Sequence, residues 1–159
     1  LTPDMALEIP KQPEFEMGGG GLYGTAGDYA NFVRMMLNNG RSDRGEQVLK
    51  PETVAQMSKN AMGNCKVGLL KTAMAPLSND AECFPGVEKQ WGLSFMINNT
   101  PAPTGRSAGS LAWAGLANTY YWIDQKKGIG GVYATQVLPF ADTKALPLFY
   151  AFEKETYAA

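Results

Sequence analysis

The segment SAGSLAWAGLANTYYWIDQKKGIGGVYATQVL, residues 107–138, decides the fold of this chain. It holds three runs rich in aromatic and β-branched residues, which favour strands. A short turn near Leu116-Ala117 separates the first two runs, and the polar residues 125–128 separate the second from the third. Runs joined by such short connections pair as antiparallel neighbours. The segment therefore predicts a meander of strands over 107–115, 118–124 and 129–138.

Helical periodicity flanks this β-rich segment on both sides. After Thr25, an N-cap with Asp28 at capping-box spacing, apolar residues recur at helical intervals as far as Gly40. A shorter helix is predicted from Pro51, with Val54, Met57 and Ala61 facing inward. A last helix is predicted over 146–157, with an inward face of Leu148, Phe149, Phe152 and Thr156.

The whole chain divides into four stretches of different character. Residues 1–17 are an irregular lead-in, and 18–62 hold a glycine loop and two helices. Residues 63–90 form a long loop, of the kind that covers a site or is an insertion. Residues 91–159 hold the antiparallel strands, the first over 91–98, and the C-terminal helix. This order predicts an α+β fold in which an antiparallel meander packs against helices.

Composition excludes several kinds of chemistry. The chain has 159 residues and a formal net charge of −1, so there is no electrostatic reason to expect nucleic acid as a partner. No apolar run approaches the ~20 residues of a membrane span. Histidine is absent, which excludes Ser-His-Asp and Cys-His catalysis and argues against a zinc site. We expect no metal ion and no cofactor, and catalysis would have to use Lys, Tyr, a carboxylate or backbone dipoles.

The cysteines and the start of the chain leave the cellular compartment open. Cys65 and Cys83 lie in one polar, irregular stretch, where they would either pair in an exported protein or remain as two free thiols. The chain opens on Leu1-Thr2-Pro3-Asp4, without an initiator Met or a signal-like stretch. We therefore expect a truncated or processed N-terminus.

Gly19-x-Gly21-x-x-Gly24 matches the letters of a dinucleotide-binding fingerprint. That motif needs a buried parallel strand before it, and the prolines and charges of residues 9–16 are incompatible with such a strand. The glycines favour a loop that requires positive φ angles.

Four pieces of the sequence carry a resemblance to a known family. They are GGGGLYGTAGDY over 18–29, LKPETV over 49–54, WGLSF over 91–95 and WAGLANTYYWID over 113–124. Their order resembles the C-terminal part of serine β-lactamase-like proteins, closest to class C β-lactamase-related esterases and penicillin-binding-protein-like hydrolases. The resemblance covers residues 15–157 except the 63–90 loop. It implies a partial β-lactamase/transpeptidase-like domain, completed by an N-terminal portion of the same protein or by a second chain, with association into oligomers as a further possibility.

In that family a Ser-x-x-Lys motif supplies the nucleophile and a base, and a third motif, Lys-Thr-Gly or Trp-x-Gly, lines the pocket from an edge strand. Trp113-Ala114-Gly115 matches the third motif in its Trp form. The resemblance implies that Trp113, Ala114 and Gly115 bind substrate and that the Leu116 backbone N–H is an oxyanion donor, a contact worth about 3 kcal/mol. An apolar wall at Trp113, in place of a cation, would favour neutral acyl groups.

Purely structural roles remain open for the same residues. Trp113, Tyr120, Tyr121 and Trp122 also fit strand aromatics that pack against helices. Gly115 also fits a β-bulge.

No Ser-x-x-Lys occurs anywhere in the chain. Met57-Ser58-Lys59 has the wrong spacing, because a helix needs i and i+3 to place both groups on one face. The sequence therefore predicts the C-terminal portion of a serine hydrolase that acts through an acyl-enzyme on small esters, amides or lactams. Esterase-like substrates are favoured, and the chain alone should be inactive because it holds neither nucleophile nor base. The alternative is a non-catalytic binding or scaffold protein of the same fold.

Overall fold

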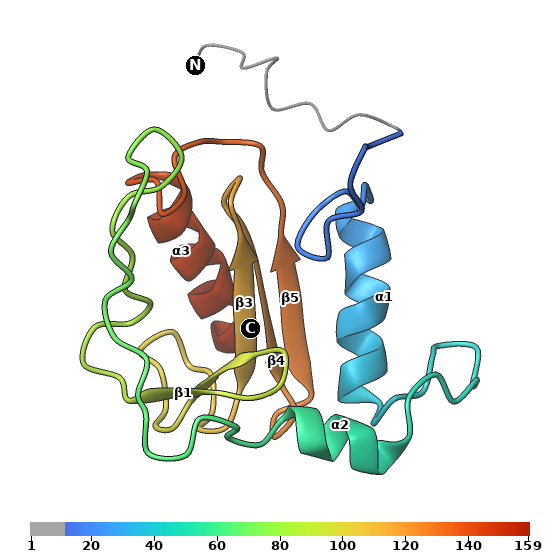
Figure 1. The fold of residues 1–159 in the computed structure, drawn as a ribbon. Helices are drawn as coiled ribbons and strands as arrows, with labels where there is room; N and C mark the ends of the chain where they lie inside the picture. The colour runs from blue at the N-terminus through green and yellow to red at the C-terminus, as the bar shows by residue number, and fades with distance from the viewer. Residues whose placement is uncertain (1–11) are drawn as a thin grey trace.

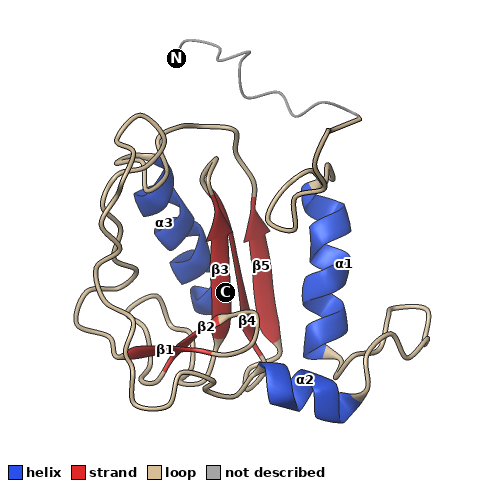
Figure 2. Ribbon diagram, viewed as in Figure 1, coloured by secondary structure: helices blue, strands red, loops and turns tan. Residues whose placement is uncertain are grey.

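A five-stranded antiparallel sheet separates two layers of helices in the computed structural model, which describes residues 12–159 (Figure 1). Helices α1 (Ala26–Leu37) and α2 (Pro51–Met57) cover one face, and α3 (Ala145–Ala158) covers the other (Figure 2). This arrangement confirms the α+β prediction. The expectations for residues 1–11 lie outside the described part of the chain. Between residues 12 and 159, no helix combines the length and apolar character needed to cross a bilayer.

The strands lie in the sheet in their order along the chain. They are β1 (Lys89–Trp91), β2 (Met96–Asn98), β3 (Leu111–Gly115), β4 (Thr119–Asp124) and β5 (Ile129–Tyr133). Every neighbouring pair is antiparallel, so the predicted meander is confirmed.

The single strand predicted over 91–98 is wrong, because the chain reverses within it. The Gly92 N–H donates to the Phe95 carbonyl over 2.8 Å, and β1 turns back to pair with β2. A Cβ on Gly92 would lie 2.3 Å from the Met57 carbonyl oxygen at the end of α2. Only glycine therefore allows the hairpin to sit this close to α2. The same helix end leaves Ala61 outside α2 and exposed, contrary to its predicted inward position.

The strand predicted over 129–138 is also shorter than expected. β5 ends at Tyr133, whose partner Tyr120 is the second residue of β4, so little of β4 remains to pair with. The chain then crosses the β3–β4 turn, and the Val137 N–H donates to the Ala117 carbonyl over 3.2 Å.

Helix α1 begins where the local signals predict. The Thr25 hydroxyl accepts from the Asp28 N–H over 3.1 Å, and the Asp28 carboxylate accepts from the Thr25 N–H over 2.9 Å, which completes the capping box. The inner face of α1 packs on β4 and β5 around Val33 and Met36. A Cβ on Gly130 would lie 2.6 Å from a Val33 methyl, so glycine at this point of β5 permits the close approach.

Helix α3 presents a different face from the one predicted. Ala145, Phe149 and Glu153 are buried, whereas Leu148 and Phe152 are 58% and 42% exposed. The inner face contains a carboxylate because Glu153 pairs with buried Arg106. A search for apolar periodicity counts such a glutamate as outward-facing and shifts the whole helix face.

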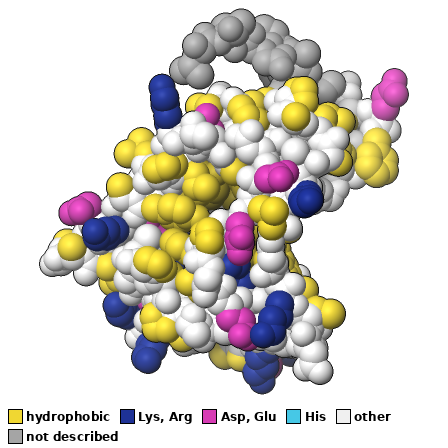
Figure 3. All heavy atoms as spheres, turned by 90° about the vertical axis from the view of Figure 1, so that its left-hand side faces the viewer, with side chains coloured by type: hydrophobic (Ala, Val, Ile, Leu, Met, Phe, Trp, Pro, Cys, Tyr) yellow, Lys and Arg dark blue, Asp and Glu magenta, His cyan; other side chains and the backbone are white. Residues whose placement is uncertain are grey.

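The segment between α2 and β1 runs beside α3, shown in green in Figure 1. Isolated bridges join Leu70 to Ala81 and Ser78 to Phe140. Cys65 and Cys83 are both free thiols in this fold. Figure 3 shows apolar side chains gathered across this face of the molecule. The exposed large apolar residues of the segment and of α3 are Leu69, Leu70, Met74, Leu148 and Phe152.

Candidate functional site

Strand β3 has different surroundings at its two ends. Leu111 and Ala112 pair with β2 on one side and with β4 on the other. Residues 113–115 pair with β4 alone, so within the described chain this half of β3 is an open edge of the sheet. The Trp-x-Gly tripeptide thus lies on an edge, although β3 as a whole is the middle strand.

The side chains of Trp113 and Ala114 lie on opposite faces of the sheet. Trp113 packs against the core on the α1 side, and its ring meets Trp91 edge-on with centroids 4.4 Å apart. Ala114 packs against the core on the α3 side, where Phe149 lies. The structure therefore brings Trp113 and Ala114 to one edge, where both line a small cavity, although their side chains point to opposite faces of the sheet.

Packing does not explain why residue 115 is glycine. Gly115 continues the register opposite Thr119 without a bulge, so the bulge interpretation is wrong. A Cβ at this position would meet nothing nearer than the Thr119 Cβ at 3.7 Å, an ordinary contact. The fold therefore has room for a side chain at 115, and the glycine leaves the backbone accessible from outside the sheet.

The Leu116 N–H follows at the start of the β3–β4 turn. Leu116 is 46% exposed. The turn closes when the Asn118 N–H donates to the Gly115 carbonyl over 3.1 Å. The Leu116 N–H itself has no hydrogen-bond acceptor within the part of the chain that the structure describes. A backbone donor of this kind is available to a group from outside the chain.

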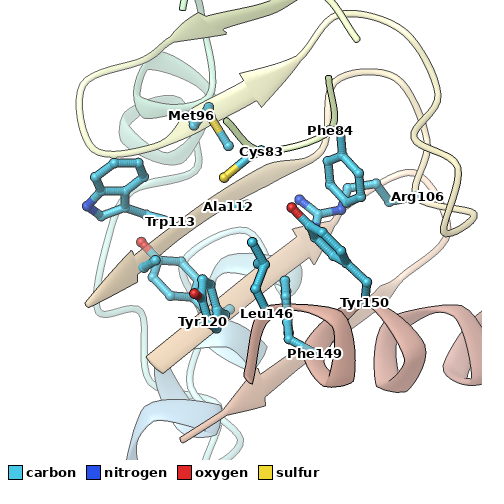
Figure 4. A pocket seen from close by; sticks show the side chains of 12 residues that line it. Cys83, Phe84, Met96, Arg106, Ala112, Trp113, Tyr120, Leu146, Phe149 and Tyr150 are labelled. Atoms are coloured by element: carbon cyan, nitrogen blue, oxygen red, sulfur yellow. The ribbon is translucent and has the colours of Figure 1, made fainter. Parts of the chain in front are cut away.

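Two hollows adjoin this end of the sheet. A small apolar cavity of about 20 Å³, the size of a water molecule, lies at the β3 edge. Figure 4 shows side chains of the long segment and of α3 turned toward it, whereas the Trp113 ring of β3 points to the other side of its strand. Those of the segment and of α3 are Cys83, Phe84, Leu146, Phe149 and Tyr150. A larger groove of about 740 Å³ lies between the start of α1 and the ends of β4 and β5. Its lining includes Leu22, Tyr29, Thr119, Val132 and Thr135.

Two tyrosines on the α1 side are held protonated. Tyr121 stands opposite Trp113 in the register, and its ring lies 5.0 Å from that of Tyr29. Burial raises the pKa of Tyr121 well above its usual value, and the neighbouring Tyr29 raises it further. Burial also raises the pKa of Tyr29. Both phenols therefore hold their protons more strongly than a tyrosine in water does, which favours hydrogen-bond donation over proton abstraction.

The sequence did not predict the buried charged residues near the cavity. Arg106 lines the cavity, and its guanidinium is held by Glu153 from α3. The Lys89 ammonium is also buried and donates to the Phe84 and Val87 carbonyls over 3.1 and 2.7 Å. No local pattern marks these residues, because their partners are set by the fold. Each is neutralised or hydrogen-bonded, so neither cation is available to a substrate carboxylate.

A comparison with protein families identifies the fold. The Beta-lactamase family model matches residues 2–151. The chain belongs to the Beta-lactamase family. The resemblance to serine β-lactamase-like and penicillin-binding-protein-like proteins is thereby confirmed.

The relatives that this chain matches are considerably longer than the chain itself. The chain is 26% identical over 172 aligned residues to the acyltransferase calJ of Penicillium decumbens, covering 99% of this chain and 38% of calJ. It is 30% identical over 138 residues to protein Rv1367c of Mycobacterium tuberculosis, covering 80% of this chain and 30% of that protein. The simvastatin synthase LovD of Aspergillus terreus, unliganded, has a similar fold, with a TM-score of 0.61 at 23% identity. That likeness covers 83% of this chain and 34% of LovD.

Proposed function

We propose that this chain is the C-terminal portion of a serine enzyme that transfers acyl groups through a covalent acyl-enzyme. The observation that carries the proposal is the open half of β3, which presents residues 113–115 and then the free Leu116 N–H. The serine nucleophile and its base would come from a portion of the protein beyond this chain, because no Ser-x-x-Lys is present. The chain alone would then form no acyl-enzyme.

In the proposed reaction the acyl carbonyl lies against the backbone of Gly115 and Leu116. Negative charge develops on its oxygen as the serine attacks. A fixed N–H donor stabilises this charged oxygen in the transition state more than it stabilises the neutral carbonyl oxygen in the ground state. Leu116 would supply one donor, worth about 3 kcal/mol. The absence of a side chain at Gly115 would let the substrate approach this closely.

The expected substrates are small neutral esters. By the resemblance of Trp113-Ala114-Gly115 to the third motif, Trp113 would stand where a lysine binds a carboxylate in the Lys-Thr-Gly form. Among the described residues that line the cavity, the cation Arg106 is already paired with Glu153. An ester without a negative charge therefore fits the site better than a substrate that carries a carboxylate.

The acyl group would pass to water, as in an esterase, or to an alcohol. Transfer to an alcohol is a second candidate because a relative that aligns with 99% of this chain is named an acyltransferase. The half-reaction that forms the acyl-enzyme is the same in both cases, so the site proposed here serves either.

The missing portion would complete the sheet and fill the groove. β5 has a neighbour on one side only within the described chain, and Leu22 beside the groove is 99% exposed. The chain also spans only 38% and 30% of the two relatives above. We propose that an N-terminal portion of the same protein, or a second chain, covers these surfaces; an oligomer is the alternative.

The test uses the full-length gene product and this chain expressed alone. The full-length protein should show a burst of p-nitrophenol from p-nitrophenyl butyrate and should be labelled on one serine by a fluorophosphonate. The chain alone should show neither. Adding a primary alcohol and measuring ester against free acid distinguishes transfer from hydrolysis. A full-length protein without burst and without serine labelling would contradict the proposal and favour the non-catalytic scaffold.

A further inference from the structure

Asn118 is a completely buried polar residue in an unusual backbone conformation. It is 0% exposed and has a φ of 59°, in the left-handed region that few residues other than glycine and asparagine adopt. It closes the turn that begins at Leu116. Its N–H donates to the Gly115 carbonyl, which belongs to the same peptide group as the Leu116 N–H, so closing the turn restrains the direction of that N–H.

The side-chain amide of Asn118 is fully hydrogen-bonded. Its Nδ2 donates to the Val137 and Pro139 carbonyls over 2.7 and 2.8 Å. Its Oδ1 accepts from the Tyr120 hydroxyl over 2.7 Å and from the Asp142 N–H over 3.0 Å. Both donors and both acceptor positions of the amide are thus occupied, which leaves it one orientation.

The backbone of the turn is held from the same side. The Thr135 hydroxyl lies 2.6 Å from the Ala117 carbonyl and 3.0 Å from the Asn118 carbonyl, so its one hydrogen is shared between the two. The Val137 N–H adds a bond to Ala117. The segment that follows β5 is therefore hydrogen-bonded to the turn through both side-chain and backbone groups.

The network continues to the start of α3. The Asp142 carboxylate accepts from the Lys144 and Ala145 N–H groups, both over 2.9 Å, and so caps the helix. Leu146 in the first turn of α3 lines the cavity beside Trp113. One amide thereby joins the turn, the segment after β5 and a wall of the candidate site.

We infer that Asn118 is a positioning residue that sets the direction of the Leu116 N–H for the developing oxyanion. The inference rests on the proposed function for its catalytic part. A donor displaced by about 1 Å can lower the rate of a chemical step roughly 100-fold, while substrate binding is affected much less. Asn118 touches no substrate and acts only through the turn.

A matched control lies at the end of β2, beside the residues that lead into β3. Asn98 is also buried, and its Nδ2 donates to the Thr100 and Ser107 carbonyls, both over 2.8 Å. Asn98→Asp and Asn118→Asp each remove two donors to backbone carbonyls and bury a carboxyl group. Comparable losses of stability are expected from both, but only the second change touches the turn of Leu116.

The test compares both variants with the wild type in the full-length protein. Single-turnover acylation by a p-nitrophenyl ester should be roughly 100-fold slower in Asn118→Asp at nearly unchanged KM, and near wild type in Asn98→Asp. The infrared carbonyl stretch of the acyl-enzyme should move to higher frequency only in Asn118→Asp, because the oxyanion hydrogen bond weakens. Equal acylation rates and equal carbonyl frequencies in the two variants would overturn the inference.

A second measurement needs no catalysis. With ¹⁵N-leucine labelling, relaxation of the Leu116 amide should show a rigid N–H in the wild type and in Asn98→Asp, and a mobile one in Asn118→Asp. If Asn118→Asp does not fold, Thr135→Val should show the same change, since it removes the hydroxyl that holds both turn carbonyls. A Leu116 amide that stays rigid in these variants contradicts the inference. Wild-type protein that is not acylated contradicts the proposed function instead, and the relaxation data then decide the role of Asn118.

Discussion

The guanidinium of Arg106 and the carboxylate of Glu153 form a two-pronged ion pair in the interior, between the segment before β3 and helix α3. Arg106 Nε lies 2.6 Å from Glu153 Oε1, and the second guanidinium nitrogen binds the other carboxylate oxygen. The two residues are 2% and 0% exposed. The guanidinium also lies over the Phe84 ring, 5.0 Å from its centroid. The pair therefore links α3 to the segment just before β3, and through Phe84 to the long segment between α2 and β1 that lines the cavity.

Glu153→Leu should lower the free energy of unfolding by about 3–5 kcal/mol, because it leaves the Arg106 charge buried without a partner. The double variant Arg106→Met/Glu153→Leu should regain much of this loss, since both charges then disappear. Urea unfolding of the full-length protein measures both. A double variant less stable than Glu153→Leu would show that Arg106 stabilises the fold through other contacts, such as the one with Phe84.

Gly115→Ala should leave stability within about 0.5 kcal/mol of the wild type, since the new methyl group makes only ordinary contacts. Acylation in the full-length protein should fall at least about tenfold, because the methyl group displaces the substrate carbonyl. Gly131→Ala is the contrasting variant: its Cβ would lie 2.2 Å from the Trp122 ring, so it should lose stability. Thermal unfolding and burst kinetics separate the two effects. Unchanged acylation in Gly115→Ala would remove Gly115 from the site.

Asp124 should make stability depend on pH. Burial by itself would raise the pKa of this carboxyl, but hydrogen bonds from the Ser107 and Lys127 N–H groups and the Tyr157 hydroxyl outweigh it and lower the pKa. The stabilisation is therefore complete above the unfolded-state pKa of about 4 and is lost as the pH falls through the lower native value. Asp124→Asn should lose about 1–3 kcal/mol at pH 7, and this difference should narrow below about pH 4. A difference that stays constant from pH 7 to pH 2 would contradict the assignment.

The two thiols should differ in reactivity. Cys65 is exposed, whereas Cys83 is largely covered. Burial raises the pKa of the Cys83 thiol, and the nearby positive charges of Arg106 and Lys89 offset only part of this effect. Under native conditions a thiol reagent such as DTNB should modify Cys65 first. The rate at Cys83 should be at most about one tenth of that rate, and the two rates should become equal after denaturation. Cys65→Ser and Cys83→Ser assign the two phases, and a fast phase that survives in Cys65→Ser would contradict the placement of Cys83.

Local signals in the sequence predicted the parts of the fold that depend on neighbours along the chain. Thr25 and Asp28, three positions apart in the sequence, cap α1. The β3–β4 turn lies between the two aromatic-rich runs, as predicted. The inner face of α3 was mispredicted because Glu153 is buried by an arginine 47 residues away. No sequence pattern indicates such a partner.

The candidate site follows the same division. Trp113-Ala114-Gly115 and Leu116 were identifiable from their letters and from the order of the surrounding pieces. Asn118 was not, because its amide binds Val137, Pro139 and Asp142, which are 19, 21 and 24 residues away. These hydrogen bonds depend on the path of the chain after β5, and the sequence predicted β5 five residues too long.

The hairpin at Gly92 determines whether β3 has an open half at all. Continuing the register in which Met96 faces Ala112 and Ile97 faces Leu111 would set residues 95, 94 and 93 opposite 113, 114 and 115. The uninterrupted strand that the sequence suggested over 91–98 would thus have occupied the place beside the tripeptide. Gly92 instead turns the chain back beside Met57, so within the described residues no strand pairs with 113–115 on that side. The open half of β3 therefore depends on a glycine that lies outside the candidate site, and a larger residue at position 92 would force the hairpin away from the end of α2.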